Sequence, residues 1–179
     1  MRLIAPLLLF ALPALAEQED FSQYGTTNPE EMTLERLVER AQRGDVDMMV
    51  CANGYLATKA GRHEQARIIF EACAAAGWTQ AMNWMSQLDH NGLGADEDPD
   101  RATEWSRQAG ALGDPVGTYN HGIDMMRGRG VAQDVERGRA LVDQAAAQGL
   151  GIARRLQDAG YDLDAVTPDA DAWKYAPMF

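Results

Sequence analysis

The 36 residues from 114 to 149 read DPVGTYNHGIDMMRGRGVAQDVERGRALVDQAAAQG, and their pattern indicates how the chain folds. Asp114-Pro115 is typical of a helix N-terminus, because Asp caps free N–H groups and Pro fits the first turn. Gly128-x-Gly130 interrupts the run near its middle, and Gly149 closes it as glycine often closes a helix. The stretch therefore predicts a hairpin of two helices joined by a short turn.

The same pattern recurs earlier in the chain at a spacing of 36 residues. Gly77, Gly113 and Gly149 are 36 residues apart, and Gly92-x-Gly94 precedes Gly128-x-Gly130 by the same interval. A fixed period of this length, with helical patterning inside each unit, indicates stacked helix pairs. We therefore predict an all-α, right-handed α/α solenoid of three helix pairs, at residues 45–77, 78–113 and 114–149.

One further helix is expected at each end of this array. Upstream, Asn28 to Glu31 has the composition of a helix start, and the residues that follow up to Gly44 carry an apolar stripe. Downstream, residues 151–159 form a last helical stretch. Such helices would cover the stacking faces that end units cannot bury alone. The predicted solenoid thus spans residues 29–160.

The first 16 residues have the composition of a secretory signal peptide. Arg2 precedes an apolar run from Leu3 to Leu15, and Ala14-Leu15-Ala16 fits the small-x-small cleavage rule. The run is shorter than the ~20 residues that span a bilayer. We expect cleavage after Ala16, no transmembrane segment in the mature chain, and a location in the periplasm of a Gram-negative bacterium or outside the cell.

Two segments flank the predicted solenoid. Residues 17–28 are expected to form a linker. Residues 161–179 form an acidic and aromatic C-terminal tail, which includes Trp173, Tyr175 and Phe179. Because aromatic residues are unusual in purely solvated tails, their presence favours docking onto the protein or onto a partner.

Composition and motifs exclude several kinds of function. With 16 basic and 27 acidic residues the net charge is −11, which disfavours binding to the phosphate backbone of nucleic acids. Two cysteines cannot form a four-thiolate zinc site, and His63, His90 and His121 lack metal-ligand spacing. Neither a Gly-x-Ser-x-Gly nor a Ser-x-x-Lys nucleophile motif occurs. We therefore predict no catalytic residue, no metal and no cofactor.

The third unit resembles the Sel-one-like repeat (SLR), a relative of the tetratricopeptide repeat. The resemblance rests on Gly117-x-Tyr119-x-x-Gly122, Gly128-x-Gly130-Val131-x-x-Asp134 and Ala145-Ala146-x-x-Gly149. The second unit keeps much of the pattern, whereas the first looks closer to a plain tetratricopeptide unit. The sequence departs from the usual repeat pattern at Ser86, Gly138 and His121. The resemblance implies an α-solenoid that binds proteins or peptides in bacterial envelope, signalling or secretion roles, and it fixes no single biochemical activity.

The resemblance also nominates a binding face, because the first helix of each pair lines the concave side of tetratricopeptide-type solenoids. By repeat position, the groove would be lined by Tyr55, Asn83, Gln87, His90, Tyr119 and Met126. Taken singly, each of these is better explained as an ordinary exposed or packing residue, and only the cluster as a whole indicates a groove. The expected function is a non-enzymatic exported adaptor, scaffold or regulator that binds a protein or peptide partner.

Cys51 and Cys73 fall on the two helices of the first unit. Secreted, cysteine-rich SLR proteins cross-link helix pairs in this general manner, so a disulfide is favoured in an oxidising compartment. Counted from the turn, the two positions are offset by roughly 6 Å along the helix axis, near the limit that a disulfide tolerates. Two buried free thiols are the alternative. The same relatives suggest an alternative function, weak β-lactam binding or hydrolysis, which no named residue supports.

Overall fold

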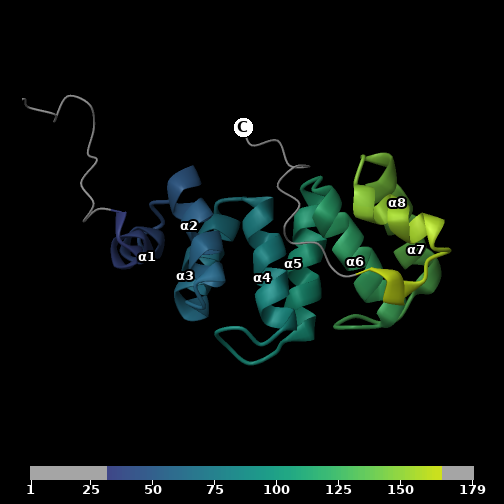
Figure 1. The fold of residues 1–179 in the computed structure, drawn as a ribbon, viewed down its shortest axis with the longest axis horizontal. Helices are drawn as coiled ribbons and strands as arrows, with labels where there is room; N and C mark the ends of the chain where they lie inside the picture. The colour runs from purple at the N-terminus through teal and green to yellow at the C-terminus, as the bar shows by residue number, and fades with distance from the viewer. Residues whose placement is uncertain (1–31, 167–179) are drawn as a thin grey trace, which may run out of the picture.

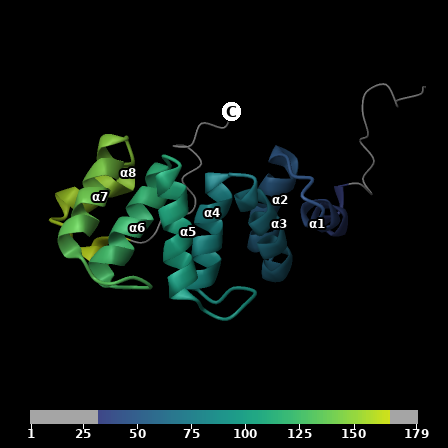
Figure 2. The ribbon, with the colours of Figure 1, turned by 180° about the vertical axis from the view of Figure 1, so that it is seen from behind.

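The structure is a computed structural model in which residues 32–166 are described. Within this range eight α-helices follow one another along the long axis of the molecule, with no strand between them (Figure 1). The view from behind shows the same linear order of helices (Figure 2). This arrangement confirms the predicted α-helical solenoid. The expected signal peptide, the linker and most of the tail lie outside the described residues.

Three helix pairs form the body of the solenoid, and each helix packs against its neighbours in the chain. The helix α1 (Leu34–Gln42) precedes these pairs, and α8 (Gly151–Asp158) follows them, before a short 3-10 helix η3 (Leu163–Ala165). The pairs are α2 (Met48–Lys59) with α3 (His63–Ala75), α4 (Thr79–His90) with α5 (Pro99–Ala111), and α6 (Pro115–Arg127) with α7 (Val135–Ala147). We call the surface formed by α2, α4 and α6 the first-helix face.

Side-chain caps decide where several of these helices begin. Asp114 accepts hydrogen bonds from backbone N–H groups in the first turn of α6, as the sequence predicts, and Asp98 and Asp134 do the same for α5 and α7. The start of α1 differs from the prediction. This helix begins at Leu34, because the Thr33 hydroxyl accepts a hydrogen bond from the Arg36 N–H and acts as its N-cap. The expected cap at 28–31 lies outside the described residues.

The second glycine of each Gly-x-Gly pair lies against the preceding hairpin. A Cβ on Gly94 would lie 2.7 Å from the backbone carbon of His63 at the start of α3, and one on Gly130 would overlap the backbone oxygen of Pro99 at the start of α5. Both glycines also have positive φ angles, of 75° and 67°. The two loops protrude at the same edge of the solenoid (Figures 1 and 2). The glycine pattern therefore encodes a contact between successive units as well as a turn.

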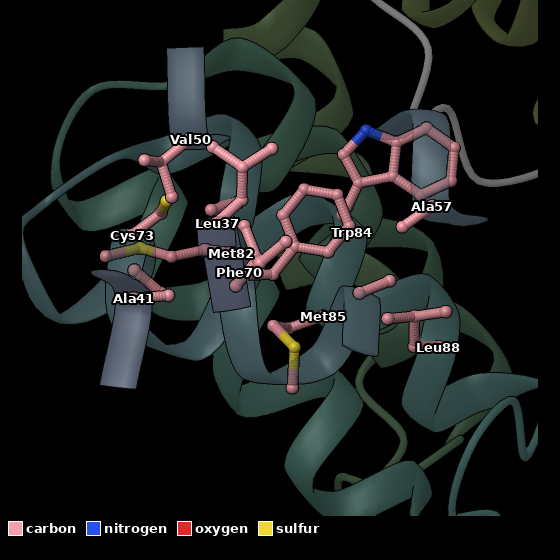
Figure 3. Close-up of a cluster of buried hydrophobic side chains, with 14 of the residues drawn as sticks. Leu37, Ala41, Val50, Ala57, Phe70, Cys73, Met82, Trp84, Met85 and Leu88 are labelled. Carbon is pink, nitrogen blue, oxygen red and sulfur yellow. The ribbon is translucent and has the colours of Figure 1, made fainter. Parts of the chain in front are cut away.

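Two clusters of buried apolar side chains fill the interior. The first joins α1 to α5, and the rings of Phe70 and Trp84 stack at its centre with centroids 5.9 Å apart (Figure 3). Leu37 and Ala41 bring the apolar stripe of α1 into this cluster. The second cluster joins α6, α7 and α8, and it includes Val166 near the end of the described chain. Both terminal helices thus cover the ends of the array as predicted.

A disulfide joins α2 to α3. The Cα atoms of Cys51 and Cys73 are 6.0 Å apart, and their sulfur atoms are bonded. The disulfide prediction is therefore confirmed, and the alternative of two free thiols is wrong. Since the turn between the helices lies at residues 60–62, the bond fastens this hairpin near its opposite, open end.

Candidate functional site

The six residues predicted to line a groove all lie on the first helices α2, α4 and α6. Asn83, His90, Tyr119 and Met126 are buried, and Tyr119 is fully buried. Tyr119 and Met126 belong to the apolar cluster of the last three helices, which accounts for their burial. Tyr55 and Gln87 are half-buried and keep accessible surface. The role of the whole set in partner binding stays a prediction.

A line of polar atoms runs along α4. Asn83 Oδ1, Gln87 Nε2 and His90 Nδ1 are buried, and within residues 32–166 they have no hydrogen-bond partner. The three residues are four and three positions apart, so they share one face of the helix. A buried polar atom without a partner costs about 1–3 kcal/mol. This line, which we call the α4 polar line, therefore holds hydrogen-bonding capacity that residues 32–166 do not use.

The far end of the α4 polar line is fixed by an interaction with α6. His90 Nε2 lies 3.2 Å from Asp124 Oδ2, and both side chains are buried. Because a carboxylate only accepts hydrogen bonds, His90 Nε2 is the donor in this contact. The bond holds the imidazole ring in place and leaves Nδ1 directed away from Asp124. The Arg129 guanidinium also donates to the His90 backbone oxygen at 2.6 Å, which ties this helix end to the next loop.

An apolar pocket lies between α2 and α4, beside the α4 polar line. Its volume is about 40 Å³. The Tyr55 and Trp84 rings are tilted against each other with centroids 5.4 Å apart, and Lys59 Nζ lies 5.0 Å from the Tyr55 centroid. Met48 is 54% exposed at the rim of this α2–α4 pocket. The lining residues are Met48, Cys51, Ala52, Tyr55, Phe70, Trp78, Gln80, Ala81 and Trp84.

A buried ion pair that sequence reasoning missed joins three helices. Asp89 on α4 is fully buried and accepts hydrogen bonds from the Arg67 guanidinium on α3 and, at 3.1 Å, from Trp105 Nε1 on α5. Arg67 also donates to the Leu93 backbone oxygen at 3.3 Å. Since every polar contact of Asp89 is made within the protein, we assign this group a structural role. One signal was available in the sequence: Asp89 follows Ala81 and Met85 at a spacing of four, on a stripe that is otherwise apolar.

Two further properties bear on the kind of site that the described chain can form. Over residues 32–166, no three His, Cys, Asp or Glu side chains come together as they would to hold a metal ion. Each helix in the same range is too short or too polar to cross a bilayer.

His121 provides a prediction about pH. Burial lowers the pKa of His121 below 6.5, and the charge of Asp124 offsets this only in part. Between the folded pKa and 6.5 the unfolded chain binds more protons, so the free energy of unfolding falls as the pH decreases through this window. We expect urea unfolding at pH 7 and at pH 5 to show that the free energy of unfolding decreases less between these pH values for His121→Gln than for the unaltered chain. Parallel decreases in the two proteins would contradict this.

Comparisons with known proteins agree with this architecture. Residues 79–114 and 115–150 each match the family described as Sel1 repeat, and these ranges coincide with the hairpins α4–α5 and α6–α7. A Sel1 repeat protein from Oxalobacter formigenes has a similar structure, at 24% identity and a TM-score of 0.56 over 69% of this chain and 52% of that one. Helicobacter pylori cysteine rich protein B is similar at 15% identity and a TM-score of 0.57, over 74% of this chain and 98% of that one.

A third structure is similar over a comparable part of the chain. It is c5321, a protective antigen of uropathogenic Escherichia coli strains that displays an SLR fold, at 19% identity and a TM-score of 0.50 over 75% of this chain and 35% of that one. The chain spans about half the length of the Oxalobacter protein that it matches. No functionally curated protein matches the sequence. At these identities the likeness concerns the fold.

Proposed function

We propose that this chain, which carries two Sel1 repeats in an α-helical solenoid, binds an extended segment of a partner protein along its first-helix face. The α4 polar line is the observation that carries the proposal. Asn83 Oδ1 acts only as a hydrogen-bond acceptor, and Gln87 Nε2 acts only as a hydrogen-bond donor. An extended peptide offers one backbone donor and one acceptor per residue, so it can serve both atoms.

The α2–α4 pocket adds an anchoring position beside this line. Its walls are aromatic and aliphatic, and Met48 at its rim is more than half exposed. With a volume of about 40 Å³ the pocket admits a small apolar group, such as the tip of a partner side chain, while the rest of that side chain packs against the exposed Met48 at the rim. The proposed ligand is therefore a peptide that combines an extended backbone with at least one bulky apolar side chain.

We further propose that the protein is exported and acts without catalysis, as an adaptor, scaffold or regulator of the bacterial envelope. The composition of residues 1–16 supports export. The disulfide between Cys51 and Cys73 supports an oxidising compartment, since such bonds persist outside the reducing cytosol. Turnover of nitrocefin that survives stringent purification would instead favour the alternative, β-lactam hydrolysis.

Two neighbouring methionines provide a matched test of the binding face. Met48 lines the α2–α4 pocket, whereas Met49, next to it on α2 and 47% exposed, does not. We expect Met48→Lys to weaken the binding of a peptide selected from a random library at least about tenfold, because a lysine charge is costly to desolvate in an apolar pocket. We expect Met49→Lys to change the Kd less than about twofold, since it adds a charge on solvated surface.

The measurement is isothermal titration of the selected peptide into each variant, with circular dichroism to show that helicity is unchanged. Equal effects of the two substitutions would contradict the proposed site. A library that yields no peptide with measurable affinity would contradict the proposed function itself.

A further inference from the structure

We propose that residues 167–179 of the same chain occupy the α2–α4 pocket and the α4 polar line in cis, so that a partner peptide must displace them. The proposal rests on the binding face proposed above, and it names the segment that occupies this face when no partner is bound. Four features carry it: the path of the chain up to Val166, the length of the segment, its side chains, and the unsatisfied atoms of α4.

The described chain already turns back along the solenoid after α8. Arg127, at the end of α6, donates a hydrogen bond of 2.7 Å to the backbone oxygen of Leu163 in η3. Val166 is buried in the cluster shared by α6, α7 and α8. The chain has therefore returned from α8 to α6 at the last described residue. The next first helix, α4, packs directly against α6.

The segment is long enough to reach the pocket. Residues 167–179 are thirteen in number. An extended chain covers roughly 3.3 Å per residue, so this segment can span up to about 43 Å. Packed helices lie about 8–10 Å apart, which gives a path of about 20 Å across the helices. The pocket lies at the N-terminal ends of α2 and α4 whereas Arg127 ends α6, which adds about 20 Å along the helices, so the path takes roughly two thirds of that reach. The remaining length allows the segment to follow the face at an angle.

The side chains of the segment match the pocket in kind. Trp173, Tyr175, Met178 and Phe179 are four large apolar side chains within seven residues. The pocket presents Tyr55, Trp78 and Trp84, and aromatic pairs gain about 0.5–1.5 kcal/mol beyond the burial of their area. Asp169 and Asp171 precede the aromatic residues, and Lys59 stands beside the pocket, so the charges are complementary as well.

The α4 polar line is the independent observation that points to a ligand. Asn83 and His90 are each more than nine-tenths buried, and Asn83 Oδ1 and His90 Nδ1 have no partner within residues 32–166. A backbone lying across α4 on its way to the pocket would supply those partners. The route from α6 to the pocket crosses α4, so one segment can satisfy the line and fill the pocket.

Occupation in cis has a measurable consequence for a competing peptide. A short flexible tether gives an effective concentration of about 1 mM. A peptide that binds the vacant face with a Kd of about 100 μM would then bind the unaltered chain about tenfold more weakly. The probe is a synthetic peptide with the sequence of residues 167–179, titrated into the chain that begins at Glu17 and into its Trp173→Ser/Tyr175→Ser variant.

We expect the probe to bind the double variant about tenfold more tightly than the unaltered chain. In the double-variant background, Met48→Lys should abolish this binding and Met49→Lys should preserve it. Hydrogen exchange of α4 should be faster in the double variant than in the unaltered chain when no probe is present. Both substitutions lie outside the described helices, so thermal unfolding monitored by circular dichroism controls for the fold.

Three results would overturn self-occupation. The first is equal affinity of the probe for both chains, whether tight or weak. The second is binding that Met48→Lys leaves intact, which would place the segment elsewhere. The third is protection of α4 that depends on protein concentration, with a dimer seen by light scattering, which would make the occupant a second copy. None of these results bears on library peptides, so the proposed function is tested separately.

Discussion

The substitution Asp89→Asn is expected to lower the free energy of unfolding by about 3–5 kcal/mol, the usual cost of removing one partner of a buried ion pair. Asp89 is fully buried, and its carboxylate is the counterion of the Arg67 guanidinium, which is itself 7% exposed. Asparagine keeps the shape of the side chain and removes its charge. Arg67 would then remain charged in the interior with only neutral acceptors, the Leu93 backbone oxygen and the amide oxygen of the new side chain, and with no buried counter-charge.

Urea unfolding followed by circular dichroism measures this effect. Glu104→Gln is the matched control, because Glu104 pairs with Arg107 where both side chains are about half exposed. Hydrogen bonds from Arg107 and Gln108 lower the pKa of Glu104 to about 2, but exposed pairs contribute only about 0–1 kcal/mol to stability. A loss for Asp89→Asn no larger than that for Glu104→Gln would show that the buried pair does not hold the three helices together.

Removal of the disulfide is expected to cost on the order of 3 kcal/mol. The bond closes a loop between residues 22 apart in the chain, and the chain-entropy model assigns about this stabilisation to a loop of that length. Cys51→Ala/Cys73→Ala should therefore unfold at a clearly lower urea concentration than the unaltered chain. Alanine suits position 73, because Ala109 and Ala145 hold the equivalent place in the next two units.

The reductant dithiothreitol supplies the control for the disulfide. It should lower the urea midpoint of the unaltered chain towards that of the double variant and should leave the double variant unchanged. A midpoint of the unaltered chain that does not respond to full reduction, verified by intact mass, would contradict a stabilising role.

The helices could be predicted from the sequence because their ends carry local signals. Asp114 caps the helix that it was expected to cap, since an N-cap acts on N–H groups two or three residues away, and Asp98 and Asp134 cap their helices in the same way. Gly77, Gly113 and Gly149 have positive φ angles at the ends of the second helices, which is why glycine recurs there. The disulfide followed from a family resemblance, and the structure shows the pairing.

The candidate site was harder to predict because burial depends on contacts between distant residues. Repeat position placed Tyr119 and Met126 on a first helix, yet it says nothing of how many neighbours cover each side chain. The pairing of Arg67 with Asp89 could not be predicted from the repeat, because the residues 36 positions later are Thr103 and Met125, which cannot form an ion pair. The α2–α4 pocket likewise combines residues from three helices and a loop, a grouping that only the packed structure defines.

The contact between each Gly-x-Gly loop and the hairpin before it gives the array a direction of growth. The loop of each unit packs against the start of the second helix in the unit before it. Gly94 lies against His63 in this way, and Gly130 lies against Pro99. A copy of the 36-residue module inserted after Gly113 would bring its own loop and would find a receiving helix on α5. The compact turn of the first hairpin contains no Gly-x-Gly pair. The solenoid is therefore suited to lengthening by duplication within its C-terminal half, because each copied unit contains both a Gly-x-Gly loop and a second helix against which the next loop can pack.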